Sequence, residues 1–461
     1  MKSIGKNFFF LSSAEITSKI LGFLTTAYLA RRIGVDGFGD YGFVVAVYAY
    51  LALIANPGYD IVGTREIVHS EKEQFNVFNS LFLLKSGSTI VSFIILLLIC
   101  LVVPFSSTVK QLLMLQSLML FTIPFTFQFF FRGNNQMHIV AISRFAQSVL
   151  YFLFVFLGVR SAEDLPRVPV FFAISSAFAL IPMVWILKKN FVWFRGTQWE
   201  QLRAYFVSAV TVGAASMCIQ VYLNLDTVLL GVFRTNHEVG IYISAYKIVT
   251  LASAIPSLLF ASYLPYLISI KSTETKEWKK FVLTMFTIGL PTGIIINIYA
   301  PELTTILYGK AYDSAVIPLR ILSFDIIAVF ISITFAQPLL LLGEEKKYLS
   351  IVACSAGLNL LLNLFMIPWY GMIGAAITTV LAESLVAFRS WKAIKRKVES
   401  TFIKEISEIV LISGTAVLLM FLCMNIFHWN LTIAVISFII FYSVITTYWY
   451  SNQIKTIRGI T

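Results

Sequence analysis

Long apolar segments recur along the whole chain and are separated by short polar breaks. A helix needs about 20 apolar residues, at 1.5 Å each, to cross the hydrocarbon core of a bilayer, and about fourteen segments reach that length. Only 13% of the residues are charged, against roughly 25% in soluble domains. We therefore predict an all-α polytopic membrane protein with about 14 transmembrane helices. The predicted spans are residues 8 to 30, 41 to 63, 81 to 104, 112 to 132, 139 to 159, 168 to 188, 204 to 233, 241 to 268, 281 to 300, 315 to 342, 349 to 368, 371 to 392, 406 to 427 and 431 to 450.

The excess of basic residues indicates a membrane topology and not a nucleic-acid partner. The net charge is +12, and cytoplasmic loops of membrane proteins are enriched in Lys and Arg. With the N-terminus inside, about 25 of the 35 Lys and Arg residues fall on the cytoplasmic side. We therefore expect both termini in the cytoplasm and anionic lipid beside the basic loops. The first span is followed by no small-residue cleavage site, so we expect it to stay in the membrane.

Motifs for enzymatic chemistry are missing from the sequence. It has no G-x-x-x-x-G-K-[ST] loop for ATP, and its four cysteines and four histidines lack metal or disulfide spacing. The predicted outer loops are too short to hold a catalytic domain. We therefore expect a transporter without cofactor or metal, driven by a proton gradient, a sodium gradient or the membrane potential.

A faint internal repeat relates two halves of the chain. LARRIGVDGFGDYGF, from Leu29, aligns with LGVFRTNHEVGIYIS, from Leu230, so that Gly39 and Gly240 are equivalent. Transporters are commonly built from duplicated halves with the substrate site between them. Six helices per half would relate the halves by an axis along the membrane normal. The predicted parts are a six-helix lobe at 1–188, an interfacial connector at 189–203, a six-helix lobe at 204–395, and two additional helices with a cytoplasmic tail at 396–461.

Lys19 lies about 11 residues into the first span, near the bilayer midplane. A charged side chain that faces lipid at this depth costs at least about 3 kcal/mol, so we expect it to face protein or a wet cavity. An ion pair with Glu15, one helical turn earlier, is the structural interpretation. We favour a cavity-lining cation, because charges within membranes tend to mark transport pathways. The equivalent position in the second half is Gln220, which would leave the cation on one lobe only.

Four further ionisable residues lie within predicted spans. Asp226 and Lys247 lie about 10 Å below the outer ends of two consecutive spans, so we expect them to meet as an ion pair. This pair would either fix the packing of the hairpin or line the cavity. Asp325 and Glu383 lie near mid-depth in the tenth and twelfth spans. Each could carry a proton or a sodium ion during transport, or be a protonated, hydrogen-bonded carboxyl group.

Proline and glycine predict breaks in two of the spans. Pro57 and Gly58 interrupt the second span, and Pro338 interrupts the tenth. Such breaks free backbone carbonyl groups, which must then meet protein or water.

Three blocks in the second half resemble a known family. They are NLLLNLFMIPWYGMIGAAITT from Asn359, LYGKAYDSAVIPLRIL from Leu307 and NLDTVLLG from Asn224. They resemble the polysaccharide-exporting, Wzx-type branch of the multidrug/oligosaccharidyl-lipid/polysaccharide (MOP) transporter superfamily. SKILGF, from Ser18, also resembles the S-R-x-L-G of the MurJ lipid II flippases, whose arginine lines a cationic cavity. Lys19 falls on that arginine and keeps its charge but not its bidentate fork.

This resemblance implies a fold of two six-helix lobes that form a V around a central cavity, in the bacterial cytoplasmic membrane. It implies the translocation of an undecaprenyl-diphosphate-linked oligosaccharide, such as an O-antigen unit, from the inner to the outer leaflet. Lys19 would attract the diphosphate, and a polysaccharide polymerase or chain-length regulator would be a partner. A lipid II flippase is the nearest alternative. A drug/cation antiporter of the MATE type would prefer an acidic cavity, and a membrane glycosyltransferase would need a large outer loop.

Overall fold

The computed structural model describes residues 2–69, 74–188, 198–268, 276–395, 403–426, 437–438 and 440–446, and it is helical throughout these ranges. This confirms the predicted all-α class. The helices are α1 (Lys2–Ala55), α2 (Tyr59–His69), α3 (Gln74–Val102), α4 (Ser107–Gln116), η1 (Ser117–Phe125), α5 (Gln128–Gly133), α6 (Met137–Gly158), η2 (Ala162–Asp164), α7 (Arg167–Lys188), α8 (Trp199–Phe233), α9 (Asn236–Ala252), α10 (Ala254–Ile268), α11 (Lys276–Ile298), α12 (Ala300–Tyr308), η3 (Lys310–Ala315), α13 (Val316–Leu341), α14 (Glu345–Lys395) and α15 (Ile403–Ile426).

Nine helical stretches of the described chain are long and apolar enough to cross a membrane. Two of them, Ile16–His69 and Glu345–Lys395, have 54 and 51 residues, more than twice the length that one crossing needs. Each contains a glycine with non-helical dihedral angles, Gly34 and Gly371, where the chain turns between two predicted spans. The total of fourteen crossings stays a prediction, since most of the last predicted span lies outside the described residues.

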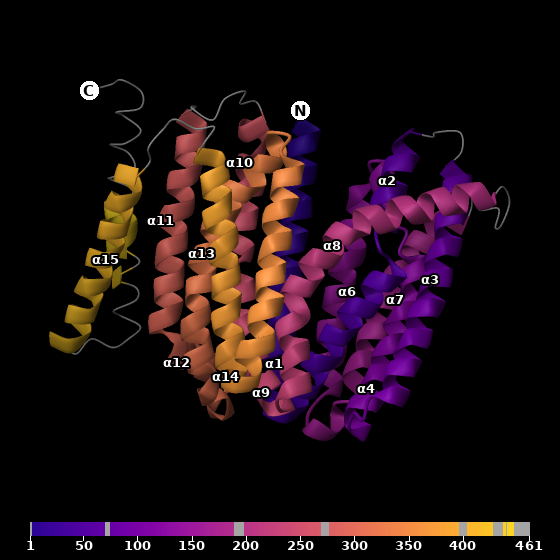
Figure 1. The fold of residues 1–461 in the computed structure, drawn as a ribbon, viewed down its shortest axis with the longest axis horizontal. Helices are drawn as coiled ribbons and strands as arrows, with labels where there is room; N and C mark the ends of the chain where they lie inside the picture. The colour runs from indigo at the N-terminus through magenta and orange to yellow at the C-terminus, as the bar shows by residue number, and fades with distance from the viewer. Residues whose placement is uncertain are drawn as a thin grey trace. The chain divides into compact units, whose positions relative to one another are not determined.

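The helices form two compact units, neither of which is continuous in sequence. Unit 1 comprises residues 1–247, 304–315 and 359–375, and unit 2 comprises 248–303, 316–358 and 376–461. Unit 1 thus combines the N-terminal helices with the start of α9, η3 and the middle of α14 (Figure 1).

Aromatic side chains fill the core of unit 1 between α2, α3 and α5. Phe127, Phe129 and Phe131 alternate along the chain into and beside α5, and all three are buried. They pack with Phe78 of α3 and Tyr59 of α2. This packing fixes the short helix α5 against its neighbours, because buried aromatic rings contribute most of the contact area in such cores.

The fourth predicted span is not one helix. Residues 112 to 132 were expected to form a single helix, whereas the structure divides this region into α4, η1 and α5. Pro124 lies inside η1, and Thr126 and Phe127 have non-α dihedral angles. The proline removes a backbone donor, and the freed carbonyl of Thr126 accepts a hydrogen bond from Lys85.

The two predicted breaks have different outcomes. Helix α1 ends at Ala55 and α2 begins at Tyr59, with Gly58 at a φ of 144°, so the break at Pro57 and Gly58 is confirmed. The break predicted at Pro338 is wrong, because α13 continues through it to Leu341. Pro338 lies in the last turn of α13, and its own carbonyl accepts the Leu342 amide.

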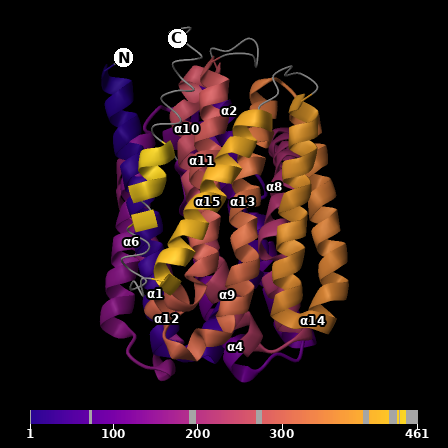
Figure 2. The same cartoon turned by 90° about the vertical axis from the view of Figure 1, so that its left-hand side faces the viewer.

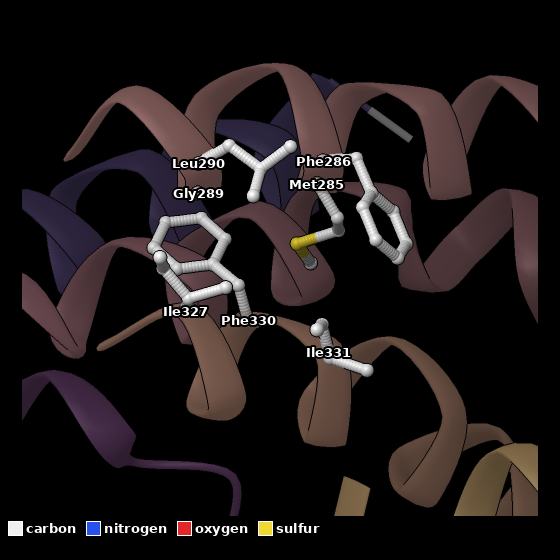
Figure 3. Close-up of a pocket in the computed structure, with 7 residues that line it drawn as sticks. All are labelled: Met285, Phe286, Gly289, Leu290, Ile327, Phe330 and Ile331. Atoms are coloured by element: carbon white, nitrogen blue, oxygen red, sulfur yellow. The ribbon is translucent and has the colours of Figure 1, made fainter. Parts of the chain in front are cut away.

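Unit 2 contains α11 and α13 packed side by side (Figures 1 and 2). A narrow crevice between them is lined only by apolar residues and a glycine (Figure 3). Gly289 of α11 lies against the Phe330 ring of α13, which lets the two helices approach closely. The crevice therefore reflects helix packing and offers no polar group to a ligand.

Candidate functional site

Lys19 lies on α1, and its side chain is exposed. The apolar residues Ile16 and Ile20 beside it are exposed as well, as expected for a helix that borders either lipid or a cavity. Its predicted partner Glu15 lies among the residues whose side chains the structure does not describe. Gln220 of α8 is half-buried, and its side-chain oxygen accepts a hydrogen bond from Asn224 at 3.0 Å. The role of Lys19 in substrate binding stays a prediction.

Asp226 lies in a buried polar cluster that joins α8, α9 and α14. Its carboxylate accepts hydrogen bonds from the Tyr242 hydroxyl at 2.8 Å and from the side-chain amide of Asn363. Asn363 also donates to Asn359 at 3.0 Å, one turn away on the same face of α14. Asp226 is 4% exposed, and both asparagines are fully buried. Buried carboxylate and amide oxygens can hold a proton or act as hard ligands for a small cation.

The predicted pairing of Asp226 with Lys247 is not formed by the described residues. Asp226 is held by Tyr242 and Asn363, and no ion pair to Lys247 is found in the part of the chain that the structure describes. Depth along the helices places both residues at a similar level, but it does not determine which faces of the two helices meet. Lys247 is half-buried on α9.

Two charges at the end of the α8–α9 hairpin hold the turn within α14. Arg234 donates to the carbonyls of Ile367 and Trp369, each at 3.2 Å, where the first half of α14 ends. Glu238 accepts the amide of Met372 at 3.0 Å, where the second half begins. A cation at a helix C-terminus and an anion at an N-terminus both complement the helix dipole. The pair therefore positions α14, which carries Asn359 and Asn363, against α8, which carries Asp226.

The equivalent turns of the two predicted halves meet in unit 1. His237 at the start of α9 contacts Asp36 of α1 at 2.9 Å, and Asn236 donates to Asp40. Asp36 and His237 are equivalent in the predicted repeat. The internal repeat thus identified two turns that lie together in the fold.

The two predicted ion-coupling residues lie in unit 2. Asp325 of α13 is 4% exposed and Glu383 of α14 is 8% exposed. Glu383 accepts a hydrogen bond from the hydroxyl of Ser332, which lies two turns after Asp325 on the same face of α13. Both carboxyl groups are therefore on the packed side of α13 and α14, as either interpretation requires. Among the described residues no group of His, Cys, Asp or Glu has the arrangement of a metal site.

Sequence reasoning missed a buried ion pair between α2 and α3. The ammonium group of Lys85 is fully buried and lies 2.7 Å from the carboxylate of Asp60. It also donates to the Thr126 carbonyl at 2.9 Å and lies 5.0 Å from the centre of the Phe129 ring. The third predicted span began at residue 81, which left Lys85 near the membrane surface. Helix α3 begins at Gln74, which places Lys85 about 16 Å along the helix.

Residues 4–271 match the family model described as polysaccharide biosynthesis protein. The chain belongs to this family. It is 22% identical over 400 residues to the putative O-antigen transporter of Escherichia coli K12, covering 83% of this chain and 95% of that protein. It is also 22% identical over 403 residues to the probable flippase AglR of Haloferax volcanii, covering 84% of this chain and 82% of the relative.

A solved structure of the lipid II flippase MurJ, in an inward closed conformation, has a similar fold. The TM-score is 0.82 at 16% sequence identity, and the likeness covers 97% of this chain and all of that one. The family member described here therefore has a fold of the MurJ type. At this identity the likeness concerns the fold and not the cargo.

Proposed function

We propose that this protein is a flippase that moves a lipid-linked oligosaccharide from the inner to the outer leaflet of the bacterial cytoplasmic membrane. The observation that carries the proposal is the combination of a MurJ-type fold over nearly the whole chain with membership of the polysaccharide biosynthesis family. Relatives named as an O-antigen transporter and a probable flippase support the same activity. They support transport and not enzymatic catalysis.

The proposed cargo is an undecaprenyl-diphosphate-linked repeat unit of a surface polysaccharide. The exposed position of Lys19 in an apolar helix supports this, because a cation at that depth is stable only beside water, protein or an anion. The lipid tail would stay in the bilayer while the diphosphate and sugars pass through the protein. A polymerase or chain-length regulator on the outer side would consume the product, and both chain termini would lie in the cytoplasm.

The energy source is proposed to be an ion gradient or the membrane potential. The buried carboxylates Asp226, Asp325 and Glu383 are the candidates for carrying a proton or a sodium ion. The hydrogen-bonded setting of Asp226, among neutral donors on three helices, supports it as a group whose charge state affects packing.

Complementation in bacteria tests the proposed function. The gene is expressed in a strain that lacks its O-antigen flippase and in a strain depleted of its lipid II flippase. Restored surface polysaccharide in the first strain only is the expected result. Rescue of peptidoglycan synthesis in the second strain only would favour the lipid II alternative. Failure in both, with the protein present in the membrane, would contradict the proposal when purified protein also fails to flip a fluorescent polyprenyl-diphosphate sugar in vesicles.

A further inference from the structure

Two arginines from different helices share one oxygen atom in unit 1. Arg132 of α5 donates to the side-chain oxygen of Gln128 at 3.1 Å, and Arg144 of α6 donates to the same oxygen at 2.9 Å. The donating nitrogens of the two guanidinium groups are therefore at most two hydrogen-bond lengths apart. The oxygen that joins them belongs to a neutral amide and does not offset their charge.

The segment that presents these arginines is held rigidly. Phe129 and Phe131 anchor one side of α5 in the aromatic core, while Gln128 and Arg132, one turn apart, share another side. Gly133 lies against Ile67 of α2, where a Cβ atom would overlap that side chain. The chain then reverses at Asn135, which has a φ of 56°, and brings α6 back beside α5. The two guanidinium groups are thus positioned before any ligand arrives, which lowers the cost of binding.

The acidic residues of the neighbouring helix α2 are bound to other cations. Helix α2 packs against α5 and has two acidic residues, Asp60 and Glu66. Asp60 is bound to Lys85 at 2.7 Å, and Glu66 is bound to Arg65 at 2.8 Å. The positive charge of the two arginines beside Gln128 therefore favours an anion bound from outside the chain.

We propose that Arg132 and Arg144, bridged by Gln128, form a binding site for the phosphoryl group of a lipid. A guanidinium group has a planar fork of donors that matches phosphate oxygens, and two forks can bind one diphosphate from both sides. Under the proposed topology the turn between α5 and α6 faces the cytoplasm. Arg144 lies about 10 Å along α6 from Met137, which places the pair near the level of the inner headgroups.

The helix that carries Arg144 continues the polar surface deeper into the protein. Ser148 and Tyr151 follow Arg144 on one face of α6, and the Tyr151 hydroxyl hydrogen-bonds Tyr41 of α1 at 3.2 Å. Polar groups beyond the arginines suit a ligand with a hydrophilic part to accommodate. The inference rests on the proposed function only for the source of the phosphoryl group, which would be the cargo diphosphate or the phosphate of an anionic membrane lipid.

Binding of farnesyl diphosphate to the purified full chain tests the site. The protein is placed in nanodiscs of phosphatidylcholine alone, and in nanodiscs that also contain phosphatidylglycerol. The decisive variant is Gln128→Glu, whose carboxylate would bind both arginines, preserve the fold and occupy the site. Its matched control is Gln147→Glu, which adds the same charge one turn further along α6 at a residue that contacts Ser176. Thermal melting of each variant accompanies the measurement.

We expect Gln128→Glu to weaken binding by at least about tenfold, since charge-assisted hydrogen bonds would be lost, and Gln147→Glu to bind as the wild type does. Binding unaffected by phosphatidylglycerol would identify the diphosphate as the ligand. Competition by phosphatidylglycerol that Gln128→Glu abolishes would identify the headgroup phosphate, and both results support the site. Unchanged probe binding by Gln128→Glu in both kinds of nanodisc would overturn it.

Two further results distinguish loss of the site from loss of the fold or of transport. If Gln128→Glu melts below the wild type, Arg132→Lys decides, because it keeps the charge and removes the fork. Weaker binding by Arg132→Lys supports the site, and unchanged binding overturns it. A wild-type chain that binds the probe through these arginines but flips no lipid would contradict the proposed function and leave the site standing.

Discussion

Gly39 and Gly240 lie backbone to backbone in unit 1, and they are equivalent residues of the internal repeat. A Cβ atom on Gly39 would overlap the carbonyl oxygen of Asn236, and one on Gly240 would overlap the carbonyl oxygen of Val35. Val35 and Asn236 are related by the same 201-residue shift as the two glycines. The contact is therefore reciprocal, as the contact of two identical surfaces across a two-fold axis would be.

Alanine at either glycine should destabilise unit 1. The added methyl group would push apart two backbones, and overpacking of this kind typically costs about 1–3 kcal/mol. We expect Gly39→Ala and Gly240→Ala each to lower the melting temperature of the purified protein. The control is Gly87→Ala in α3, where a Cβ atom meets nothing within 4 Å. Equal melting of all three variants and the wild type would contradict the close contact.

Removing one member of the buried pair Asp60–Lys85 should be more damaging than removing both. Asp60→Ala leaves a fully buried ammonium group without its carboxylate, and breaking a buried pair typically costs about 3–5 kcal/mol. The double variant Asp60→Asn with Lys85→Met leaves no charge behind. We expect its yield and melting temperature to exceed those of Asp60→Ala. A double variant that is no better than Asp60→Ala would show that the ion pair itself is required.

Lys19→Ala should abolish export, while Lys19→Arg should largely preserve it. The proposed function needs a cation at this depth and not one particular shape. Surface polysaccharide is measured in a complemented flippase-deficient strain at matched membrane levels of each variant. Full export by Lys19→Ala would instead favour a structural role for the lysine.

The helical class, the break before Tyr59 and the meeting of the Gly39 and Gly240 turns could be predicted, because they depend on segment length, proline chemistry and the repeat. The division of the fourth span could not, since its sequence is apolar throughout and its break depends on Lys85 of another helix. The partners of Asp226 were missed for a related reason. Depth along a helix can be read from residue number, but the face that meets a neighbour depends on tertiary packing.

Changes at Asp226 should not be relieved by changes at Lys247. Asp226→Ala removes the acceptor of Tyr242 and Asn363, and each buried donor left without a partner costs about 1–3 kcal/mol. We expect Asp226→Ala to lower membrane yield and Lys247→Met to give no recovery in the double variant. Tyr242→Phe removes one of these bonds and should have a smaller effect. Recovery by Lys247→Met would restore the ion-pair interpretation.

Flipping of the proposed cargo should respond to membrane potential. The cargo is an anion, and a bacterial cell is electrically negative inside, so its outward movement is favoured. Two charges that cross the full field gain about 4 to 5 kcal/mol per 100 mV, which exceeds a thousandfold bias. In sealed vesicles of defined orientation, we expect a potential that is negative on the cytoplasmic side to accelerate flipping.

Ion gradients give a separate test in the same vesicles. If Asp226, Asp325 or Glu383 carries a proton or a sodium ion inward on the return step, an imposed gradient should add to the effect of voltage. The corresponding Asn or Gln variant should lose the response to the gradient and keep the response to voltage, because the cargo still carries its charge. Rates indifferent to potential, with all ion gradients at zero, would indicate a passive carrier. Such a carrier would need polymerisation on the outer side to draw the cargo across.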